Sequence, residues 1–183
     1  IETNADLGIA VDPDVDRLVF VCEDGVIFGE ENTLVACSDY VLEKSPGSTV
    51  SNLSSSRALA DITKKHNQIH FYSAVGEVNV VKKMKECSAV IGGEGNGGVI
   101  YPKSHYGRDA LVGIGLFLSL FVERGLRASQ LLDTYPKYYM LKEKVNISSK
   151  LNVDKILKKI AKKYINEKVD LVDGVRIDFT QSW

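Results

Sequence analysis

The sequence predicts an α/β protein: a three-layer domain with a mainly parallel, mixed sheet and helices on both faces, followed by part of an α+β domain. Two observations lead to this prediction. Short β-branched and apolar runs alternate with helical patterns from residue 30 to residue 91, which is the cadence of βαβ units. After Pro136 the predicted order changes to strand, helix and hairpin, as in an α+β domain. We therefore expect three parts, residues 1–26, 27–136 and 137–183.

The individual elements follow from the spacing of apolar residues and from the breakers between them. Leu7–Val11 and Leu18–Cys22 are apolar runs that predict two buried strands. Further along, the pattern predicts helices over residues 30–43, 57–65, 77–86, 110–123 and 152–164, strands over 49–53, 69–72, 89–91 and 139–147, and a hairpin within 171–179. The apolar run Leu111–Val122 is too short to span a bilayer, and we interpret it as a buried helix capped by Asp109.

Composition restricts the possible classes of protein. The chain has 183 residues, of which 44% are hydrophobic and 26% charged, enough for one large or two small globular domains. A net charge of −1 leaves no basic footprint, so we expect neither nucleic acid nor membrane as a partner. Three widely spaced cysteines without a CxxC pattern indicate reduced thiols and a cytoplasmic protein. Because the chain opens on Ile1 in mid-pattern and stops at Trp183, we expect a piece of a longer protein.

The most informative stretch lies between the first two predicted strands. Asp12, Asp14 and Asp16 alternate there, and Arg17 follows at once. Carboxylates packed this closely repel one another, and a bound cation is the simplest way to neutralise them. Oxygen-only ligands suit a hard ion such as Mg²⁺, and an adjacent guanidinium suits a phosphate group. The stretch therefore predicts a Mg²⁺ site next to a phosphate contact.

Three other interpretations of the aspartates remain. A polar surface turn needs no ligand at all. An EF-hand places Asp12 at its first position, yet it requires glycine where Arg17 stands and helices where the flanks predict strands. An aspartyl-phosphate phosphatase uses the first aspartate of a strand-then-DxD pattern as a nucleophile, which leaves Asp16 and Arg17 without a role.

A second motif is the glycine-rich run Gly92–Gly98. It holds five glycines, with Glu94 and Asn96 as its only other residues. The plain interpretation is a flexible turn, but five glycines favour a loop whose backbone lies close to a ligand. A carboxylate and an amide in alternation suit the vicinal hydroxyls of a sugar. His105, in the following loop, is a candidate acid or base, although loop histidines are more commonly solvated.

These residues resemble the motifs of the α-D-phosphohexomutases, the family of phosphoglucomutases, phosphomannomutases and phosphoglucosamine mutases. Residues 12–17 (Asp-Pro-Asp-Val-Asp-Arg) are similar to the family's metal-binding loop DGDxDR, and residues 93–98 (Gly-Glu-Gly-Asn-Gly-Gly) to its sugar-recognition loop. Residues 74–77 (Ala-Val-Gly-Glu) resemble a short segment that the family carries between the two. The resemblance runs over nearly the whole chain, so residues 1–26, 27–136 and 137–183 would be the end of domain 2, domain 3 and the start of domain 4.

The resemblance implies a role for each motif. Members of the family move a phosphoryl group between the C1 and C6 hydroxyls of a hexose through a phosphoserine and a bisphosphorylated sugar. Carried over, Asp12, Asp14 and Asp16 would bind Mg²⁺ and Arg17 would contact the phosphate. Glu94 and Asn96 would bind the phosphohexose and the hexose bisphosphate intermediate. Neither the serine loop nor the distal phosphate loop is in the sequence, so we expect this piece to be inactive without the missing domains.

Two departures from the family pattern limit what is carried over. Pro13 stands where the family usually has glycine, which is compatible only if this position has a negative φ. Gly98 stands where many members have a histidine, so a proton-transfer role there is vacant or passes to another residue. The glycine loop resembles those of phosphoglucosamine mutases and phosphomannomutases more than that of the classical phosphoglucomutases, and of the two we favour phosphoglucosamine mutase. A DxD phosphatase and a non-catalytic sugar- or metal-binding module remain as alternatives.

Overall fold

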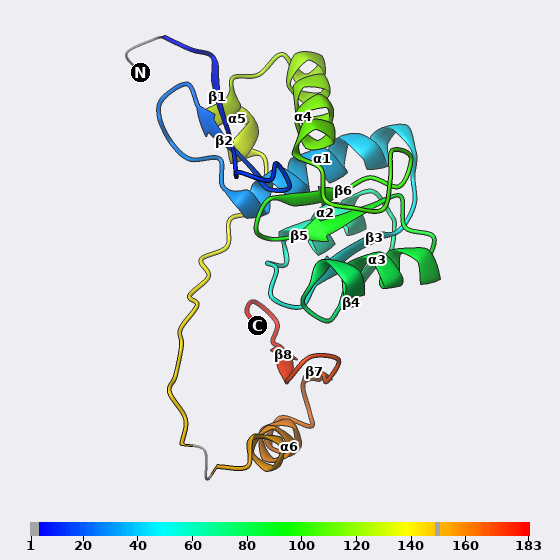
Figure 1. The fold of residues 1–183 in the computed structure, drawn as a ribbon, viewed down its shortest axis with the longest axis vertical. Helices are drawn as coiled ribbons and strands as arrows, with labels where there is room; N and C mark the ends of the chain where they lie inside the picture. The colour runs from blue at the N-terminus through cyan, green and yellow to red at the C-terminus, as the bar shows by residue number, and fades with distance from the viewer. Residues whose placement is uncertain (1–3, 149–150) are drawn as a thin grey trace. The chain divides into compact units, whose positions relative to one another are not determined.

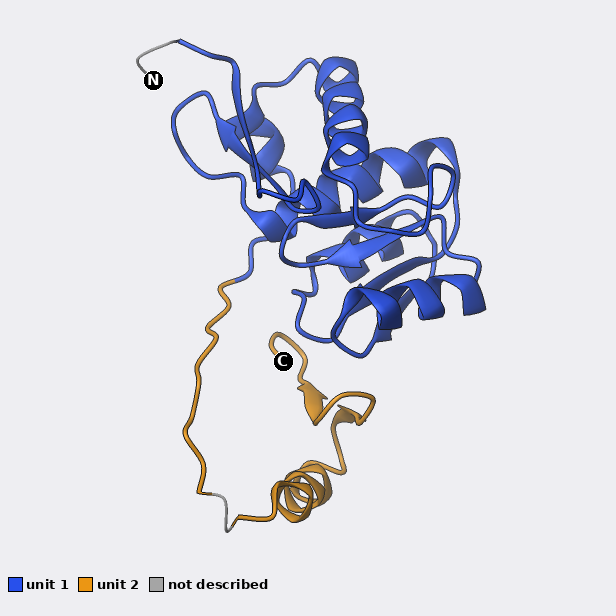
Figure 2. Ribbon diagram, in the orientation of Figure 1, with its two compact units in different colours: residues 1–138 blue, residues 139–183 orange. Residues whose placement is uncertain are grey.

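The computed structural model describes residues 4–148 and 151–183, which form two compact units. One unit ends at Tyr138 and the other begins at Tyr139 (Figure 2). The predicted boundary between residues 26 and 27, and the assignment of the three parts to domains, stay predictions.

The first unit contains most of the secondary structure (Figure 1). Its elements are β1 (Leu7–Val11), β2 (Leu18–Cys22), α1 (Glu30–Lys44), β3 (Thr49–Asn52), α2 (Ala58–Lys65), β4 (His70–Ser73), α3 (Glu77–Glu86), β5 (Ile91–Glu94), β6 (Gly98–Ile100), α4 (Ala110–Arg124) and α5 (Ala128–Asp133). The side chain of Asp109 accepts a hydrogen bond from the backbone N–H of Val112, so the predicted cap of α4 is confirmed.

The central sheet has the strand order β4-β3-β5-β6. β3 runs parallel to both β4 and β5, whereas β6 runs antiparallel to β5. α1 and α2 pack together on one face of this sheet, and α3 covers the other, where Val50 packs with Val80 and Met84 (Figure 1). The predicted α/β class, with a mixed sheet between helices, is therefore confirmed.

A second, two-stranded sheet carries the aspartate stretch. β1 and β2 form an antiparallel hairpin that pairs Val11 with Leu18, so residues 12–17 form its connecting loop. Aromatic packing fixes the hairpin to the rest of the unit. The ring of Phe20 on β2 stacks on Phe117 of α4 with centroids 3.7 Å apart, and Phe28 meets Phe117 edge-on at 5.1 Å.

The glycine-rich run is where the structure departs most from prediction. We expected a loop after a strand over 89–91, but the strand β5 begins at Ile91 and runs through Gly92 and Gly93 to Glu94. After a turn over residues 95–97, Gly98 begins β6. Glycine has a low strand propensity, and here tertiary packing overrides it. A Cβ on Gly93 would lie 2.0 Å from the Gly98 carbonyl oxygen, and one on Gly92 would lie 2.7 Å from Sδ of Met84.

Two predictions of burial were wrong. In β1 the residues Ile9, Ala10 and Val11 are exposed, because among the described residues this strand pairs with β2 alone. The helix predicted over the apolar run is present as α4, but Leu111 and Val122 are 69% and 77% exposed. They project from the side of α4 that does not contact α1 or the sheet.

The second unit is small. It contains α6 (Val153–Lys163), β7 (Lys168–Asp170) and β8 (Arg176–Asp178), with Gly174 in the left-handed region at the predicted turn between the strands. The strand predicted over 139–147 was wrong: the segment is irregular, since no described strand pairs with it. Within the part of the chain that the structure describes, no helix is both long and apolar enough to cross a membrane.

Candidate functional site

The aspartate loop converges on a small volume. Asp12, Asp14 and Asp16 each offer a carboxylate oxygen, and these oxygens all lie within 4.8 Å of one another. The loop backbone supports this arrangement, because Oδ1 of Asp12 accepts hydrogen bonds from the N–H groups of Asp16 and Arg17 at 3.1 and 3.0 Å. The three predicted metal ligands are therefore brought together.

The electrostatics of the loop differ between its ends. Backbone hydrogen bonding, first from Arg17, lowers the pKa of Asp12 from its usual value. Burial raises the pKa of Asp16 against the attraction of Arg108, and the charges of Asp14 and Asp12 raise it further. One of its oxygens, Oδ1, is buried and has no hydrogen-bond donor among the described residues. A buried carboxylate oxygen without a donor is destabilising unless a cation lies against it.

The residues present fit Mg²⁺. Three carboxylates offer hard oxygen ligands on one loop, and the undonated oxygen of Asp16 supplies an acceptor that the protein leaves unused. Arg17 does not satisfy it, since its Nε lies 3.6 Å from Oδ1 of Asp16 and from Oδ2 of Asp12, and its side chain is 53% exposed. The guanidinium thus lies beside the loop and points largely into solvent.

Pro13 is compatible with the loop. The described residues with positive φ do not include Pro13; within the loop the left-handed conformation falls on Val15, with φ 58°. This is an unusual angle for a β-branched residue and costs of the order of 1 kcal/mol or more. The carbonyl of Val15 accepts a hydrogen bond from the N–H of Ala110 at 3.1 Å, which holds the loop against the start of α4.

Glu94 ends β5 and is 4% exposed. Its Oε1 accepts hydrogen bonds from Nδ2 of Asn52 at 2.7 Å and from the N–H of Gly76 at 3.2 Å, and its Oε2 accepts one from Nη1 of Arg108 at 2.9 Å. Asn52 ends β3 and Gly76 follows β4. The donors therefore come from the carboxyl ends of neighbouring parallel strands, where α/β sheets bind ligands.

The loop after β3 holds this arrangement in place. Oδ1 of Asn52 accepts hydrogen bonds from the hydroxyls of Ser54 and Ser55, which fixes the direction of its amide group toward Glu94. The hydroxyl of Ser55 in turn accepts one from the N–H of Gly95, in the hairpin turn. Glu94 is therefore preorganised by protein donors alone, without a ligand.

Arg108 joins the two predicted motifs. Its Nη2 forms an ion pair with Oδ2 of Asp16 on the aspartate loop, while its Nη1 contacts Glu94 in the hairpin. Its Nε lies 3.4 Å from Oε2 of Glu77, and only 15% of the side chain is exposed. Four carboxylates thus contact the two guanidinium groups of Arg17 and Arg108, and Asp14 adds a fifth negative charge beside them, which leaves an excess of negative charge for a cation to offset.

Two other candidates have local partners. Asn96 lies in the hairpin turn, where its Oδ1 accepts a hydrogen bond from the N–H of Gly98 at 3.2 Å. Nε2 of His105 contacts Oδ2 of Asp109 at 2.9 Å, and the two side chains remain 50% and 25% exposed. The structure therefore gives His105 a role beside the cap of α4 and does not place it among the acidic residues that meet at Arg108.

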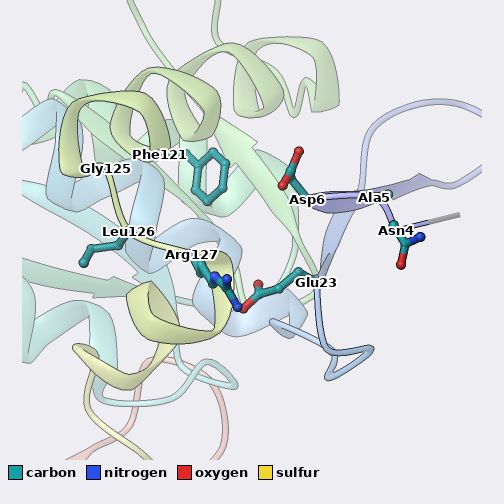
Figure 3. A pocket seen from close by; sticks show the side chains of 8 residues that line it. All are labelled: Asn4, Ala5, Asp6, Glu23, Phe121, Gly125, Leu126 and Arg127. Carbon is teal, nitrogen blue, oxygen red and sulfur yellow. The ribbon is translucent and has the colours of Figure 1, made fainter.

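An open hollow of about 520 Å³ lies elsewhere in the first unit, beside the beginning of β1 (Figure 3). Glu23 and Arg127 line it together with Phe121. Glu23 accepts hydrogen bonds from the hydroxyl and the N–H of Ser129, which fixes the start of α5. None of the predicted site residues lines this hollow, so it adds nothing to the acidic site.

Fold and site together define a class: an α/β/α domain in which a hairpin glutamate and an aspartate loop meet at one arginine. The family described as "Phosphoglucomutase/phosphomannomutase, alpha/beta/alpha domain III" matches residues 30–138. The chain belongs to the phosphoglucomutase/phosphomannomutase family, and the resemblance seen in the sequence is confirmed.

Curated relatives and solved structures agree with this assignment. The chain is 35% identical to a phosphoglucomutase/phosphomannomutase of Thermococcus kodakarensis over 98% of its length, and 32% identical to a phosphoglucosamine/phosphogalactosamine mutase of Sulfurisphaera tokodaii over 97%. A crystal structure of a phosphoglucomutase/phosphomannomutase family protein from Burkholderia thailandensis superposes with a TM-score of 0.76 at 26% identity, covering 98% of this chain and 39% of that one. The chain spans about 40% of the length of both curated relatives.

Sequence reasoning missed the residues that support the site. Asn52 is a single amide at the end of a short strand and belongs to no motif. Arg108 lies 14 residues from Glu94 and far from Asp16 in the sequence, so no spacing links it to either. One signal was available for Asn52 and Gly76: like Glu94, each lies within four residues of the carboxyl end of a predicted strand, and in a parallel sheet these ends share one edge.

Proposed function

We propose that this chain supplies the metal-binding and sugar-reading part of a phosphohexomutase, which interconverts hexose 1-phosphates and 6-phosphates through a phosphoserine and a bisphosphorylated sugar. The observation that supports it best is the buried oxygen of Asp16, which has no donor among the described residues and lies within the aspartate cluster. Family membership adds the reaction class, and the names of the two relatives add the substrate class.

In this proposal Asp12, Asp14 and Asp16 hold the metal. Bound Mg²⁺ would neutralise charge on the transferring phosphoryl group, which is most of what catalysis of this reaction requires. Arg17 contributes five N–H donors at the rim of the loop, where its half-exposed side chain is free to turn toward a phosphate. Glu94 is not a metal ligand in this proposal.

Glu94 and Asn96 read the sugar. Since Oε1 of Glu94 already accepts two hydrogen bonds and Oε2 accepts one, the remaining acceptor capacity is on Oε2, on the side of Arg108. A hexose hydroxyl donating to this oxygen would have a fixed position. Nδ2 of Asn96 offers a donor nearby in the turn. We propose glucosamine or mannose as the hexose, in a cytoplasmic enzyme.

Binding measurements on the chain as it stands test this proposal. Mg²⁺ added to the ¹⁵N-labelled chain should shift the amide signals of residues 12–16, and Asp14→Asn should weaken this binding at least about tenfold because it removes one of three ligands. Asp133→Asn, a matched change of an exposed aspartate on α5, should leave it unchanged. Magnesium shifts spread over other acidic residues, with no preference for 12–16, would contradict the metal site.

A second titration tests the sugar site. Glucosamine 6-phosphate and mannose 6-phosphate should shift the amide signals of Glu94 and Asn96, and Glu94→Gln should remove the response. A mutase assay of the 183-residue chain alone should show no turnover, since the serine loop is not in its sequence. Hydrolysis of a phosphate ester that depends on Asp12 would instead favour a DxD phosphatase.

A further inference from the structure

The side chain of Arg108 is held in an unusual position. Its backbone is fixed on both sides, because its N–H donates to Oε1 of Glu77 at 3.0 Å and the next residue, Asp109, caps α4. Residue 108 also forms an isolated bridge with Ile100 at the end of β6. From this fixed point the side chain extends back over the β5–β6 hairpin, and the guanidinium ends between Asp16 and Glu94.

Gly98 makes room for this path. A Cβ added at residue 98 would lie 2.4 Å from Cδ and 3.1 Å from Cγ of Arg108, so any other residue there would push the arginine stem aside. Gly98 does not have a positive φ, so its backbone does not require glycine. Space for Arg108 is therefore the physical reason for glycine at this position. A histidine at residue 98 and an arginine in this path exclude each other.

The guanidinium contacts Asp16 and Glu94 through different nitrogens. Nη1 donates to Glu94, and Nη2 pairs with Asp16. Because the guanidinium is a rigid plane, a movement of one carboxylate changes the angle at which the other is held. Glu94 cannot follow freely, since Asn52 and Gly76 hold its second oxygen. A change at Asp16 must therefore appear in the hydrogen bonds around Glu94.

We propose that Arg108 is a positioning residue that couples occupancy of the aspartate loop to the sugar-reading hairpin. A cation that neutralises Asp16 weakens the Asp16–Arg108 ion pair, and the guanidinium then strengthens its hold on Glu94, whose Oε2 is the oxygen proposed to accept the sugar hydroxyl. Metal binding thereby raises the affinity for the sugar, and sugar binding raises the affinity for the metal by the same factor. This inference rests on the proposed function, since it takes the aspartate loop to be the metal site.

A magnesium titration without sugar isolates the coupling. In the unaltered chain, Mg²⁺ should shift the amide signals of residues 12–16 and, with the same midpoint, the side-chain amide of Asn52 and the backbone amide of Gly76. In Arg108→Gln the loop signals should still shift, whereas those of Asn52 and Gly76 should stay in place. Lys103→Gln removes one positive charge from the same segment without contacting either carboxylate, and should behave as the unaltered chain.

The sugar titration gives the size of the effect. Saturating Mg²⁺ should tighten binding of glucosamine 6-phosphate roughly fivefold in the unaltered chain, at the lower end of usual coupling between sites, and less than about twofold in Arg108→Gln. Gly98→His should lose the coupling as Arg108→Gln does, and the double variant should lose no more than either. A role in folding alone would lower the free energy of unfolding of these variants and leave the coupling intact.

If Arg108→Gln fails to fold, Arg108→Lys replaces it. A lysine keeps the charge, but its single ammonium does not span two carboxylates, so the shifts at Asn52 and Gly76 should still be lost. Shifts at these donors that persist in Arg108→Gln or Arg108→Lys overturn the coupling and leave the metal site standing. A loop that does not respond to Mg²⁺ in the unaltered chain overturns both the coupling and the proposed function.

Discussion

The aspartate loop and the β5–β6 hairpin both present carboxylates to Arg108, yet they are built in opposite ways. Glu94 is almost completely buried, and hydrogen bonds from Asn52, Gly76 and Arg108 satisfy it. Asp16 keeps a buried oxygen without a donor among the described residues, and burial raises its pKa. The protein alone thus satisfies Glu94, whereas an oxygen of Asp16 still lacks a partner, which fits our proposal that the hairpin binds the sugar and that a cation completes the aspartate loop.

The largest expected effect of a substitution on stability is at Glu94, in the β5–β6 hairpin. Glu94→Gln should lower the free energy of unfolding by about 3 kcal/mol, because it removes one partner of a buried charge pair and leaves neighbouring donors poorly matched. Urea unfolding followed by circular dichroism measures this loss. Glu86→Gln, a matched change on the exposed end of α3, should cost less than about 0.5 kcal/mol. Equal losses in the two variants would show that burial of Glu94 adds no stability.

The hairpin turn should give the next largest effect. Gly97 has φ 88°, and a Cβ there would lie 2.3 Å from the carbonyl oxygen of Leu18, whose N–H donates a hydrogen bond to the carbonyl of Gly97 at 3.2 Å. Gly97→Ala should therefore cost about 2 kcal/mol of unfolding free energy. Gly115→Ala is the control, since nothing lies within 4 Å of a Cβ there. This change should raise the free energy of unfolding by about 0.5–1 kcal/mol, because glycine within a helix is less stable than alanine by this amount. A stabilising Gly97→Ala would refute the close contact.

A smaller effect, with a pH dependence, is expected at Asp109. Burial would raise its pKa, but hydrogen bonds from His105 and from the N–H of Val112 prevail and hold the pKa below its usual value of 3.8. A carboxyl with a lowered pKa adds stability above its unfolded pKa, and this stability is lost as the pH falls through the folded pKa. Asp109→Asn keeps a capping side chain but should cost about 0.5–1 kcal/mol at pH 7, and nothing once the carboxyl is protonated.

Urea midpoints measured from pH 7 down to pH 2.5 follow this difference. The two curves should converge at the acid end. A gap of constant size between Asp109→Asn and the unaltered chain would mean that the amide caps α4 poorly, and that the charge of Asp109 adds nothing.

Sequence patterns located most elements because their causes are local. The helix predicted over residues 77–86 has these bounds in the structure, since apolar spacing and the flanking breakers are all it needs. The glycine run was placed in a loop because glycine disfavours strands, whereas contacts with Met84 and the opposite strand decide its conformation. The segment 139–147 has the alternation of a strand, but alternation forms no strand without a partner.

The candidate site also combines features set by local sequence with features set by tertiary contacts. The aspartate triplet is a local motif, and its convergence was predictable from spacing alone. The contact of Asp16 with Arg108 joins two segments whose approach depends on how β2, β6 and α4 pack, with Leu18 bonded to Gly97 and Ala110 bonded to Val15. No pattern in either segment carries that information. The preorganisation of Glu94 is a property of the folded sheet for the same reason.

The smallest expected effect on stability, that of Asp14→Asn, gives the sharpest test of the contrast between the aspartate loop and the β5–β6 hairpin. Asp14 is exposed and shares its loop with two other carboxylates, so Asp14→Asn removes repulsion and breaks no described hydrogen bond. Without metal it should change the free energy of unfolding by less than about 0.5 kcal/mol, toward higher stability. In roughly 10 mM Mg²⁺, enough to fill a weak site, the unaltered chain should gain stability and Asp14→Asn should not. A ligand stabilises the folded state only if it binds that state.

The order of the two variants in urea should therefore reverse between EDTA and magnesium. Glu94→Gln should show no such reversal, since its loss arises inside the protein and is present in both solutions. A large loss for Asp14→Asn in EDTA would mean that the loop is completed by protein contacts after all, and the contrast between the two halves of the site would disappear. Because each half is measured against the other in the same two solutions, general effects of salt on stability cancel.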